Sequence, residues 1–405
     1  MPDASSLWWQ REDLGYRDGR LVFADRPVQA LADRFGTPSF VYSAARIRAN
    51  LDRLHGALTT AGLAGRFSLY YAMKANRFAP LLTFLKQSGL CGIDACSPAE
   101  VEHAVSCGFS PEEISFTATS LSTRDLDLLA RYDGLSMDCD SLHAIRSWGA
   151  RKPGTAIGLR VNPGMGIGRA ANDKLHYAGS VTTKFGIYEE QFAEALATAK
   201  AYDLRVSKIH FHTGCGYLTP QLEQLSRIIG HCLRFVEAAG EVERVNIGGG
   251  LGVPHVAADQ PLDLRQWADV LRRQFGDRGL HVEIEPGDYI VKDAGILLVE
   301  KTYVERKKDV LFVGVDAGFN IAPEPAHYSL PFLPLPLRDA GGPRLAAQVV
   351  GNINEALDVW YENAQLPDLT DPDHTHLALI NAGAYSSAMA SQHCLRGQFK
   401  EFLLF

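Results

Sequence analysis

A regular alternation of short apolar segments with amphipathic ones, between residues 67 and 285, most constrains the fold. Runs of apolar or β-branched residues predict buried strands, and the stretches between them have the 3.6-residue period of helices. We expect eight strands, near residues 67–73, 91–95, 114–118, 135–138, 156–161, 208–213, 244–248 and 281–285. Eight strand–helix units are typical of a TIM-type (β/α)8 barrel, the α/β fold predicted for this part.

The expected helix starts support this count. Ser97-Pro98-Ala99-Glu100 combines a capping serine, a first-turn proline and a capping-box glutamate. Val101, Ala104 and Val105 follow at helical spacing and predict one apolar face.

The chain outside the alternation predicts β structure. Residues 20–23 read as a lead-in strand and 28–35 as a small helix, followed by a strand at 39–42 and a helix over 44–61. Beyond Gly295 we expect strands at 296–304, 310–315, 345–350 and 376–381, with a long loop over 329–343. The predicted domains are therefore a barrel over residues 36–290 and an all-β domain built from 1–35 and 291–405.

Composition excludes several classes of protein. The 405 residues are 46% hydrophobic and 21% charged, as in ordinary globular enzymes, and a net charge of -7 disfavours a nucleic-acid or anionic-membrane partner. Seven cysteines without framework spacing fit reduced thiols. The N-terminus has no apolar signal core, and no run approaches the roughly 20 apolar residues that span a bilayer. A cytoplasmic location is expected.

Polar and glycine residues gather at the expected carboxyl ends of the strands, where barrels place their chemistry. In chain order these ends carry Lys74, Asp94, Arg160, His212 with Cys215, the cluster Gly248, Gly249, Gly250 and Gly252, and Glu285. A lysine at the end of a buried strand would have a lowered pKa and a reactive amine suited to a Schiff base. Its ordinary alternative is a side chain that extends to solvent.

The other strand ends fit a phosphorylated cofactor. Four glycines within residues 248–252 let backbone N–H groups approach an anion, whereas a single glycine would indicate only a turn. Glu285 could hold a ring nitrogen or form a strand-end salt bridge, and His212 could lie against an aromatic ring or fill the core. Together with Lys74 these are the parts of a pyridoxal 5'-phosphate site.

With these motifs in order, the chain resembles the fold-type III pyridoxal-phosphate decarboxylases, the family of diaminopimelate and ornithine decarboxylases. The motifs are residues 71–76, 184–187, 210–214, 246–250, 285–287, 316–320 and 383–385. The resemblance implies an alanine racemase-like fold, a Schiff base on Lys74, and Glu285 at the pyridine nitrogen. It implies Tyr385 at the cofactor phosphate and a homodimer with shared active sites. Asp94, Arg160 and Cys215 complete the expected cofactor-binding set.

Two positions depart from the family pattern. Asp288 stands after Glu-Pro-Gly, where the family usually carries an arginine that contacts the cofactor phosphate or a substrate carboxylate. Asn354 stands in place of a cysteine that enters the partner's site in relatives, although the following Glu355 is retained. We expect Asn354 and Glu355 in the catalytic set with Lys74, His212 and Glu285.

These departures predict a substrate other than diaminopimelate. Asp288 and Glu355 are expected to contact an amino acid or its conjugate, and Arg396 to hold its carboxylates. A citrate-conjugated amino acid of a siderophore pathway is our leading interpretation, and diaminopimelate decarboxylation is the alternative.

Other functions have less support. A racemase typically sets an arginine against the pyridine nitrogen, and a non-catalytic cofactor carrier lacks the second domain. A metal-dependent hydrolase needs clustered His and Asp ligands at strand ends, and only His210 and His212 are available there. We therefore expect no metal.

Overall fold

A computed structural model describes residues 7–168, 182–339 and 341–405. The chain forms two compact units. The first contains residues 1–50, 253–259 and 288–405, and the second contains 51–252 and 260–287. The predicted boundaries at residues 36 and 290 stay a prediction. The motif at residues 184–187 lies within the described part, close to the undescribed residues 169–181.

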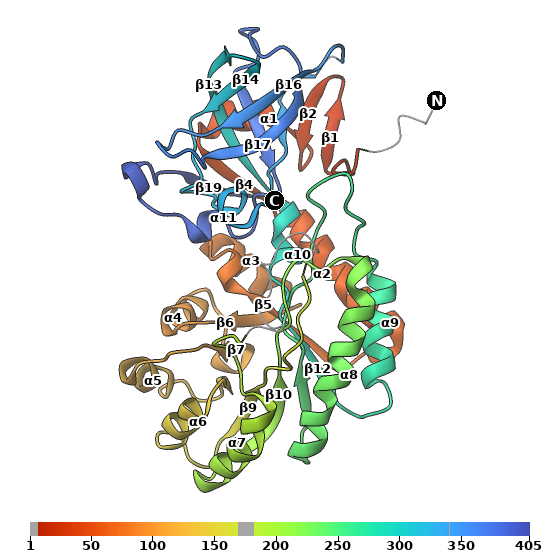
Figure 1. Ribbon diagram of the computed structural model, residues 1–405, viewed down its shortest axis with the longest axis vertical. Coiled ribbons are helices and arrows are strands. Elements are labelled where there is room, and N and C mark those ends of the chain that lie inside the picture. The colour runs from red at the N-terminus through yellow and green to blue at the C-terminus, as the bar shows by residue number, and fades with distance from the viewer. Residues whose placement is uncertain (1–6, 169–181, 340) are drawn as a thin grey trace. The chain divides into compact units, whose positions relative to one another are not determined.

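The second unit is a closed parallel barrel of eight strands, which confirms the predicted fold (Figure 1). Neighbouring strands pair in chain order, and the last pairs with the first, Glu283 lying opposite Ser68. The strands are β5 (Phe67–Ala72), β6 (Gly92–Ala95), β7 (Ile114–Thr117), β8 (Ser136–Cys139), β9 (Ala156–Arg160), β10 (Arg205–His210), β11 (Arg244–Asn246) and β12 (His281–Ile284). Because all run parallel, their carboxyl ends meet at one end of the barrel.

Helices cover the barrel because each has one apolar face. They are α3 (Ala79–Ser88), α4 (Pro98–Ser106), α5 (Thr123–Leu129), α6 (Leu142–Gly149), α7 (Glu189–Ala201), α8 (Leu222–Ala239) and α9 (Leu264–Phe275). In α4 the Ser97 side chain accepts a hydrogen bond from the Glu100 backbone, as predicted. The Glu100 carboxylate accepts from the N–H of Cys96 instead of closing the box on Ser97. Val105, expected on the buried face, is exposed because the packed face contains Val101 and Ala104.

The sixth strand differs from its prediction. β10 begins at Arg205 and ends at His210, three residues before the predicted end. His212 and Cys215 therefore lie in the loop that follows the strand. The apolar Phe211 extended the sequence pattern, but its backbone N–H donates to Asn246 beyond the paired register of β10.

The first unit is mostly β structure. A three-stranded sheet joins β1 (Leu14–Arg17), β2 (Arg20–Phe23) and β3 (Arg26–Pro27). A larger sheet has the order β15 (Pro334–Pro336), β18 (His376–Ile380), β13 (Gly295–Lys307), β14 (Val310–Val315), β16 (Leu345–Val350) and β17 (Val359–Leu366). Two further strands, β4 (Ser39–Ser43) and β19 (Lys400–Leu404), pair with each other, and β4 also pairs with β13.

An apolar core joins the strands of the first unit to helix α1 (Val28–Phe35). Val28 and Leu31 pack there with Ile296 and Leu298 of β13 and Ile380 of β18. Ile296 and Leu298 are two residues apart, so both side chains point to the same face of the sheet. The predicted helix at 28–35 and strand at 39–42 are confirmed to within one residue.

Five strands of the described residues were not predicted. β1 and β3 are short strands on either side of the predicted lead-in strand. β17 has polar residues and a left-handed Asn363 in its middle, β15 lies inside the predicted loop, and β19 is a five-residue strand near the end of the chain. The helix from Ala44 ends as α2 (Ala44–Leu58), followed by a five-residue π-type turn. In the part of the chain that the structure describes, the helices are too short or too polar to cross a membrane.

Candidate active site

The candidate Schiff-base lysine lies in a turn beyond the first barrel strand. β5 ends at Ala72, and Lys74 is the middle residue of a 3-10 turn, Met73–Ala75. Its side chain is 44% exposed, so the expectation of a buried amine is wrong. The turn begins at Met73, where the predicted strand was to end, and takes the side chain out of the strand. The Lys74 Nζ lies 3.2 Å from the Asp94 carboxylate and 3.6 Å from Cys96 Sγ.

Asp94 is a buried acid at the end of β6. Burial and the negative charge of Glu285 raise its pKa to about 7, although the Lys74 ammonium opposes this shift. One carboxylate oxygen contacts Lys74, and the other has no hydrogen-bond partner among the described residues. Asp94 can therefore change its charge near neutral pH beside Lys74.

Glu285 follows β12 directly and is 6% exposed. The Asn246 amide donates to its Oε1 at 2.7 Å, and His210 Nε2 lies 3.4 Å from its Oε2. Burial alone would raise the pKa of Glu285, but His210, Lys74 and Lys208 outweigh it and hold this pKa below its usual value. Glu285 is therefore a buried carboxylate that stays ionised.

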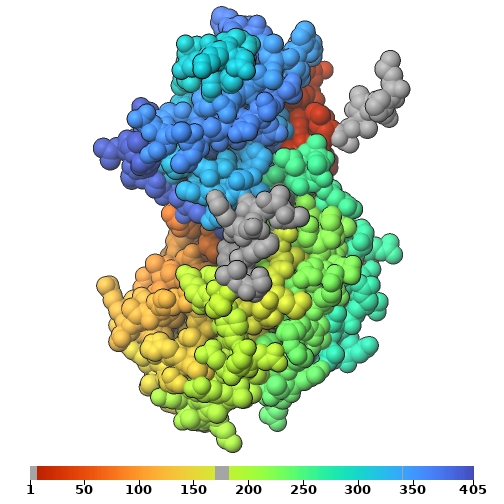
Figure 2. Space-filling view, in the orientation of Figure 1, coloured from red at the N-terminus to blue at the C-terminus, as the bar shows by residue number. Residues whose placement is uncertain are grey.

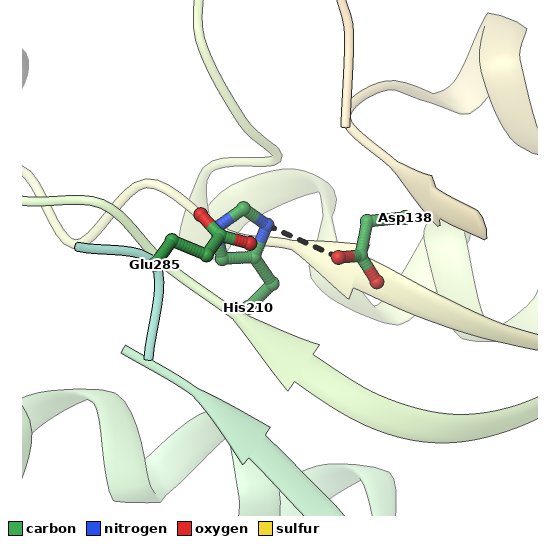
Figure 3. A group of neighbouring side chains, drawn as sticks. All are labelled: Asp138, His210 and Glu285. Atoms are coloured by element: carbon green, nitrogen blue, oxygen red, sulfur yellow. Dashed lines mark ion pairs between the residues drawn. The ribbon is translucent and has the colours of Figure 1, made fainter. Parts of the chain in front are cut away.

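A buried polar network lies inside the barrel beneath Glu285. Figure 3 shows the His210 ring between Glu285 and Asp138, with Nδ1 3.4 Å from an Asp138 oxygen. The Lys208 ammonium lies 2.9 Å from Asp138 and 3.1 Å from Glu283, and Arg244 lies 3.2 Å from Glu283. Each ion in this network therefore has at least one partner of opposite charge.

Sequence reasoning missed most of this network. It named His210 only as a possible metal ligand and did not single out Asp138, Lys208 or Glu283. One signal was available, because Lys208 and His210, like Glu283 and Glu285, are two residues apart and point to the same side of their strands. In a closed barrel one side of every strand faces the interior.

His212 stands in the loop after β10. Its Nδ1 accepts a hydrogen bond from the Gly249 backbone at 3.3 Å, and its Nε2 lies 3.8 Å from Cys215 Sγ. Burial and the positive charges of Arg160 and Lys74 lower the pKa of His212 to about 3. The ring is therefore neutral at physiological pH and suited to flat packing against an uncharged surface.

The glycine cluster packs tightly against the neighbouring strand ends. Gly248 and Gly250 have positive φ angles of 68° and 96°, which side chains rarely adopt. A Cβ atom on Gly249 would lie 2.1 Å from the carbonyl oxygen of Glu285. These glycines therefore bring the backbone close to Glu285 and His212, and their binding of a phosphate stays a prediction. Arg160, at the end of β9, lies with its guanidinium 4.8 Å from the centre of the Phe185 ring.

The remaining predicted residues belong to the first unit. Asn354 and Glu355 lie in the turn between β16 and β17, and the Glu355 carboxylate lies 3.3 Å from His393 Nε2. Arg396 is exposed, and its carbonyl accepts from the Asn320 amide. The segment before β19, dark blue in Figure 2, is at the surface of its unit, and Leu395 there is 84% exposed. No contact of these residues tests their predicted roles.

Asp288 belongs to a buried charge cluster that was not predicted. It begins the short helix α10 (Asp288–Val291), and its Oδ1 lies 3.6 Å from Nζ of Lys292 one turn later. Lys292 is fully buried and also contacts the carboxylate of Glu324 in helix α11 (Glu324–Tyr328) and the Ala384 carbonyl. Its ammonium lies 5.9 Å from the centre of the Tyr385 ring. Asp288 is therefore compensated by a lysine.

The residues of the barrel fit pyridoxal 5'-phosphate. A half-exposed amine, an ionised buried carboxylate and a neutral imidazole are the groups that hold its carbonyl carbon, its ring nitrogen and its ring face. Asp138, His210 and Glu285 also offer ligand atoms within 4.8 Å of one another, as a metal site would. Both Asp138 oxygens already have partners, Lys208 on one side and the Thr117 hydroxyl with His210 on the other. The donor set therefore favours an internal ion network over a metal site.

Comparison with known proteins decides the family. The family model of the pyridoxal-dependent decarboxylases, pyridoxal binding domain, matches residues 45–292. The diaminopimelate decarboxylase of Methanothermobacter thermautotrophicus is 34% identical over 401 residues, which cover 95% of this chain and 91% of that protein. The chain belongs to the pyridoxal-dependent decarboxylases.

Two other relatives agree with this family. The diaminopimelate decarboxylase of Streptomyces coelicolor is 30% identical over 93% of this chain and 86% of its own length. The structure of the Helicobacter pylori enzyme, complexed with L-lysine, has a TM-score of 0.83 and 25% identity and covers 93% of this chain and 94% of that one. This pyridoxal-dependent decarboxylase is therefore an enzyme of fold type III, and its cofactor is pyridoxal 5'-phosphate.

The cluster around Lys292 yields a stability prediction. Lys292→Met should lower the free energy of unfolding by about 3 kcal/mol, because it leaves the Asp288 and Glu324 carboxylates buried without their cation. Lys307→Met is the matched control, since the Lys307 side chain is 60% exposed in its pair with Glu305 and should cost less than about 1 kcal/mol. Urea unfolding of both variants measures the difference.

The same cluster supplies an internal check. Adding Asp288→Asn and Glu324→Gln to Lys292→Met should recover part of the lost stability, because the neutral amides no longer need a cation. Equal unfolding midpoints for Lys292→Met and Lys307→Met would contradict the role assigned to Lys292.

Proposed function

We propose that this decarboxylase acts on diaminopimelate, from which loss of one carboxyl group as CO2 leaves lysine. The observation that carries the proposal is the 34% identity to a diaminopimelate decarboxylase along 95% of the chain. The likeness to an enzyme complexed with L-lysine supports it, because lysine is the product of this reaction. The seven free cysteines fit the cytoplasmic location that we propose with it.

This proposal replaces the leading interpretation from sequence. The relatives do not support a citrate conjugate or a siderophore pathway, and they support the diaminopimelate alternative instead. A racemase also lacks support, because the family and the relatives are decarboxylases. In addition, the residue proposed for the pyridine nitrogen is the acid Glu285 and not the arginine typical of a racemase.

The prediction against diaminopimelate rested on Asp288 and Asn354, and it treated the charge of Asp288 as isolated. The Lys292 ammonium lies 3.6 Å from Asp288 and also contacts Glu324, so Asp288 belongs to a cluster that contains a cation. An anion near Asp288 would therefore not face an isolated negative charge. Diaminopimelate carries an ammonium and a carboxylate at its distal end. A cluster with charges of both signs is compatible with such a group, whereas a lone carboxylate would repel half of it.

When bound, pyridoxal 5'-phosphate supplies an electron-withdrawing ring that takes up the electron pair left on the α-carbon as CO2 departs. We assign Lys74 to hold the cofactor covalently, Glu285 to hold a proton at the ring nitrogen, and His212 to lie against the ring. Gly248, Gly249, Gly250, Arg160, Cys215 and Tyr385 are the proposed remaining cofactor contacts.

The protein's own groups are suited to these roles. The low pKa of Glu285 keeps the carboxylate ionised, so it can hold a proton on a ring nitrogen instead of taking that proton away. The Asp94 carboxylate orients the Lys74 ammonium at 3.2 Å. Asn354 has no acidic proton at neutral pH, so it can position a substrate but cannot protonate the α-carbon.

One observation favours a second candidate substrate, the net charge of the cluster around Lys292. Asp288 and Glu324 are both carboxylates, so the Lys292 cluster has a net charge of about -1 when all three groups are ionised. A net negative cluster favours an amino acid whose distal group is a cation or is neutral.

The kcat/KM values for a panel of substrates test the proposal. We expect kcat/KM for meso-diaminopimelate to be roughly 10⁴ M⁻¹s⁻¹ or more, the usual range for a true substrate, and above that for ornithine, arginine and citrate conjugates of diaminopropionate. CO2 release measures turnover of every compound with one readout. Faster turnover of a compound without a distal carboxylate would support the second candidate and overturn the first.

The control for this panel is to show that the protein carries pyridoxal 5'-phosphate, and on which lysine. Borohydride reduction of the cofactor-loaded protein should attach a pyridoxyl group to Lys74, as peptide mapping would show. Labelling at another lysine would overturn the assignment of Lys74 whatever the substrate.

We also propose a homodimer whose active sites are shared. Glu355 is 46% exposed beside His393, and the exposed apolar side chains of Leu357 and Leu395 flank this pair in the sequence. Exposed apolar side chains near a retained acid are suited to a partner surface.

Complementation tests the shared site. Mixing Lys74→Ala chains with Glu355→Ala chains should restore about a quarter of the wild-type activity, because half of randomly formed dimers are hybrids and each hybrid has one intact site. Lys74→Ala chains taken alone through the same mixing procedure are the control and should stay inactive. No recovery after confirmed exchange of chains would show that each chain builds its own site.

A further inference from the structure

We propose that His210 is a positioning residue that works as an imidazolium cation between Asp138 and Glu285, and that its charge keeps Glu285 ionised against the cofactor ring. The proposal rests on the family's cofactor and not on the identity of the substrate. Neither the family match nor the relatives assign a role to His210 or Asp138.

Two hydrogen-bond acceptors that face Nδ1 of His210 fix a hydrogen on this nitrogen. The Thr117 hydroxyl donates its one hydrogen to Asp138 Oδ2 at 3.1 Å, and the same hydroxyl oxygen lies 3.3 Å from His210 Nδ1. The hydroxyl can then only accept from Nδ1. Since Asp138 Oδ2 also lies 3.4 Å from Nδ1, this nitrogen faces two acceptors and must carry a hydrogen.

The other ring nitrogen faces a second carboxylate. His210 Nε2 lies 3.4 Å from Oε2 of Glu285, and Figure 3 shows the ring held between the two acids. A neutral imidazole with its hydrogen on Nδ1 would set a lone pair against the Glu285 carboxylate. A ring protonated on both nitrogens removes this repulsion, so the geometry selects the imidazolium.

The charges around the ring support the same state. Lys208 lies between Asp138 and Glu283, and Arg244 contacts Glu283. These two cations therefore compensate the negative charges of Asp138 and Glu283. Glu285 has the Asn246 amide and the His210 ring as its contacts. An imidazolium at His210 places a cation in contact with the third acid, Glu285.

Charged groups from several elements act on this site. Asp94 from β6, Asp138 from β8, Arg160 from β9, Lys208 from β10, Glu283 from β12 and Glu285 after it contribute, and His212 and Lys74 act from the loops. His210 and Asp138 are 1% and 0% exposed, so bulk water screens their interaction little. Burial raises the pKa of Asp138, and the Lys208 ammonium opposes that shift.

The charge state of His210 determines what Glu285 can do. A carboxylate buried without a cation takes up a proton, and a protonated Glu285 could not hold the ring nitrogen in its charged form. Asp138 acts one step further away, because it fixes Nδ1 and turns Nε2 toward Glu285. Asp138 therefore positions His210, and the charge of His210 keeps Glu285 ionised.

Nitrogen NMR of ¹⁵N-histidine-labelled apoprotein tests the charge state directly. At pH 8 the wild-type spectrum should contain one histidine with two protonated ring nitrogens. That signal should be absent in His210→Gln and weaker in Asp138→Asn. A wild-type spectrum in which every histidine is neutral at pH 8 would overturn the proposal, whether or not the variants fold.

The loaded enzyme supplies a second readout. His210→Gln should lower kcat roughly tenfold or more with little change in KM, and should raise the pH below which the bound cofactor's absorption changes. His210→Lys, which restores a cation, should recover part of that shift. His281→Gln is the matched control, because His281 lies at the start of β12, contacts Ser68, and should leave both readouts unchanged. An unchanged pH profile in a folded His210→Gln would overturn the role.

Discussion

The ionised carboxylate of Glu285 inside a closed barrel is the constraint on which the rest of the site depends. A buried anion is costly unless charges and hydrogen bonds compensate it. The barrel provides the Asn246 amide and the His210 ring in contact with it, and the ammonium groups of Lys74 and Lys208 at longer range. Removing this compensation would turn Glu285 into a neutral acid and remove its proposed hold on the cofactor.

Closure of the barrel makes this compensation possible. β12 pairs with β5, so the strand that leads to Glu285 adjoins the one that leads to Lys74. β8 and β10 bring Asp138 and Lys208 together across β9, with both side chains in the interior. Gly158 of β9 leaves the space, because a Cβ atom there would lie 1.8 Å from Asp138 Oδ1. Gly158 in β9 thus leaves room for the ion pair of Asp138 and Lys208 inside the barrel.

Much of the fold and part of the site followed from sequence. The eight barrel strands and the strands at 310–315 and 345–350 have strong apolar patterns, whereas β17 was missed because polar residues interrupt it. Lys74, Asp94, Glu285 and His212 could be named from their places after strands. The burial of Lys74 was predicted wrongly. Lys292 and Asp138 were not found, because Glu324 and Lys208, which pair with them, lie far away in sequence and meet them only in the folded chain.

Turnover of the Glu285→Gln variant tests the central claim most directly. Glutamine keeps a carbonyl oxygen that can accept from Asn246, so the change removes the charge with little change in shape. With the best substrate of the wild-type enzyme, the loaded variant should still bind cofactor but lose roughly 10²-fold in kcat, about 3 kcal/mol of transition-state stabilisation. Turnover close to that of the wild type would show that the charge of Glu285 is not what the site is built to maintain.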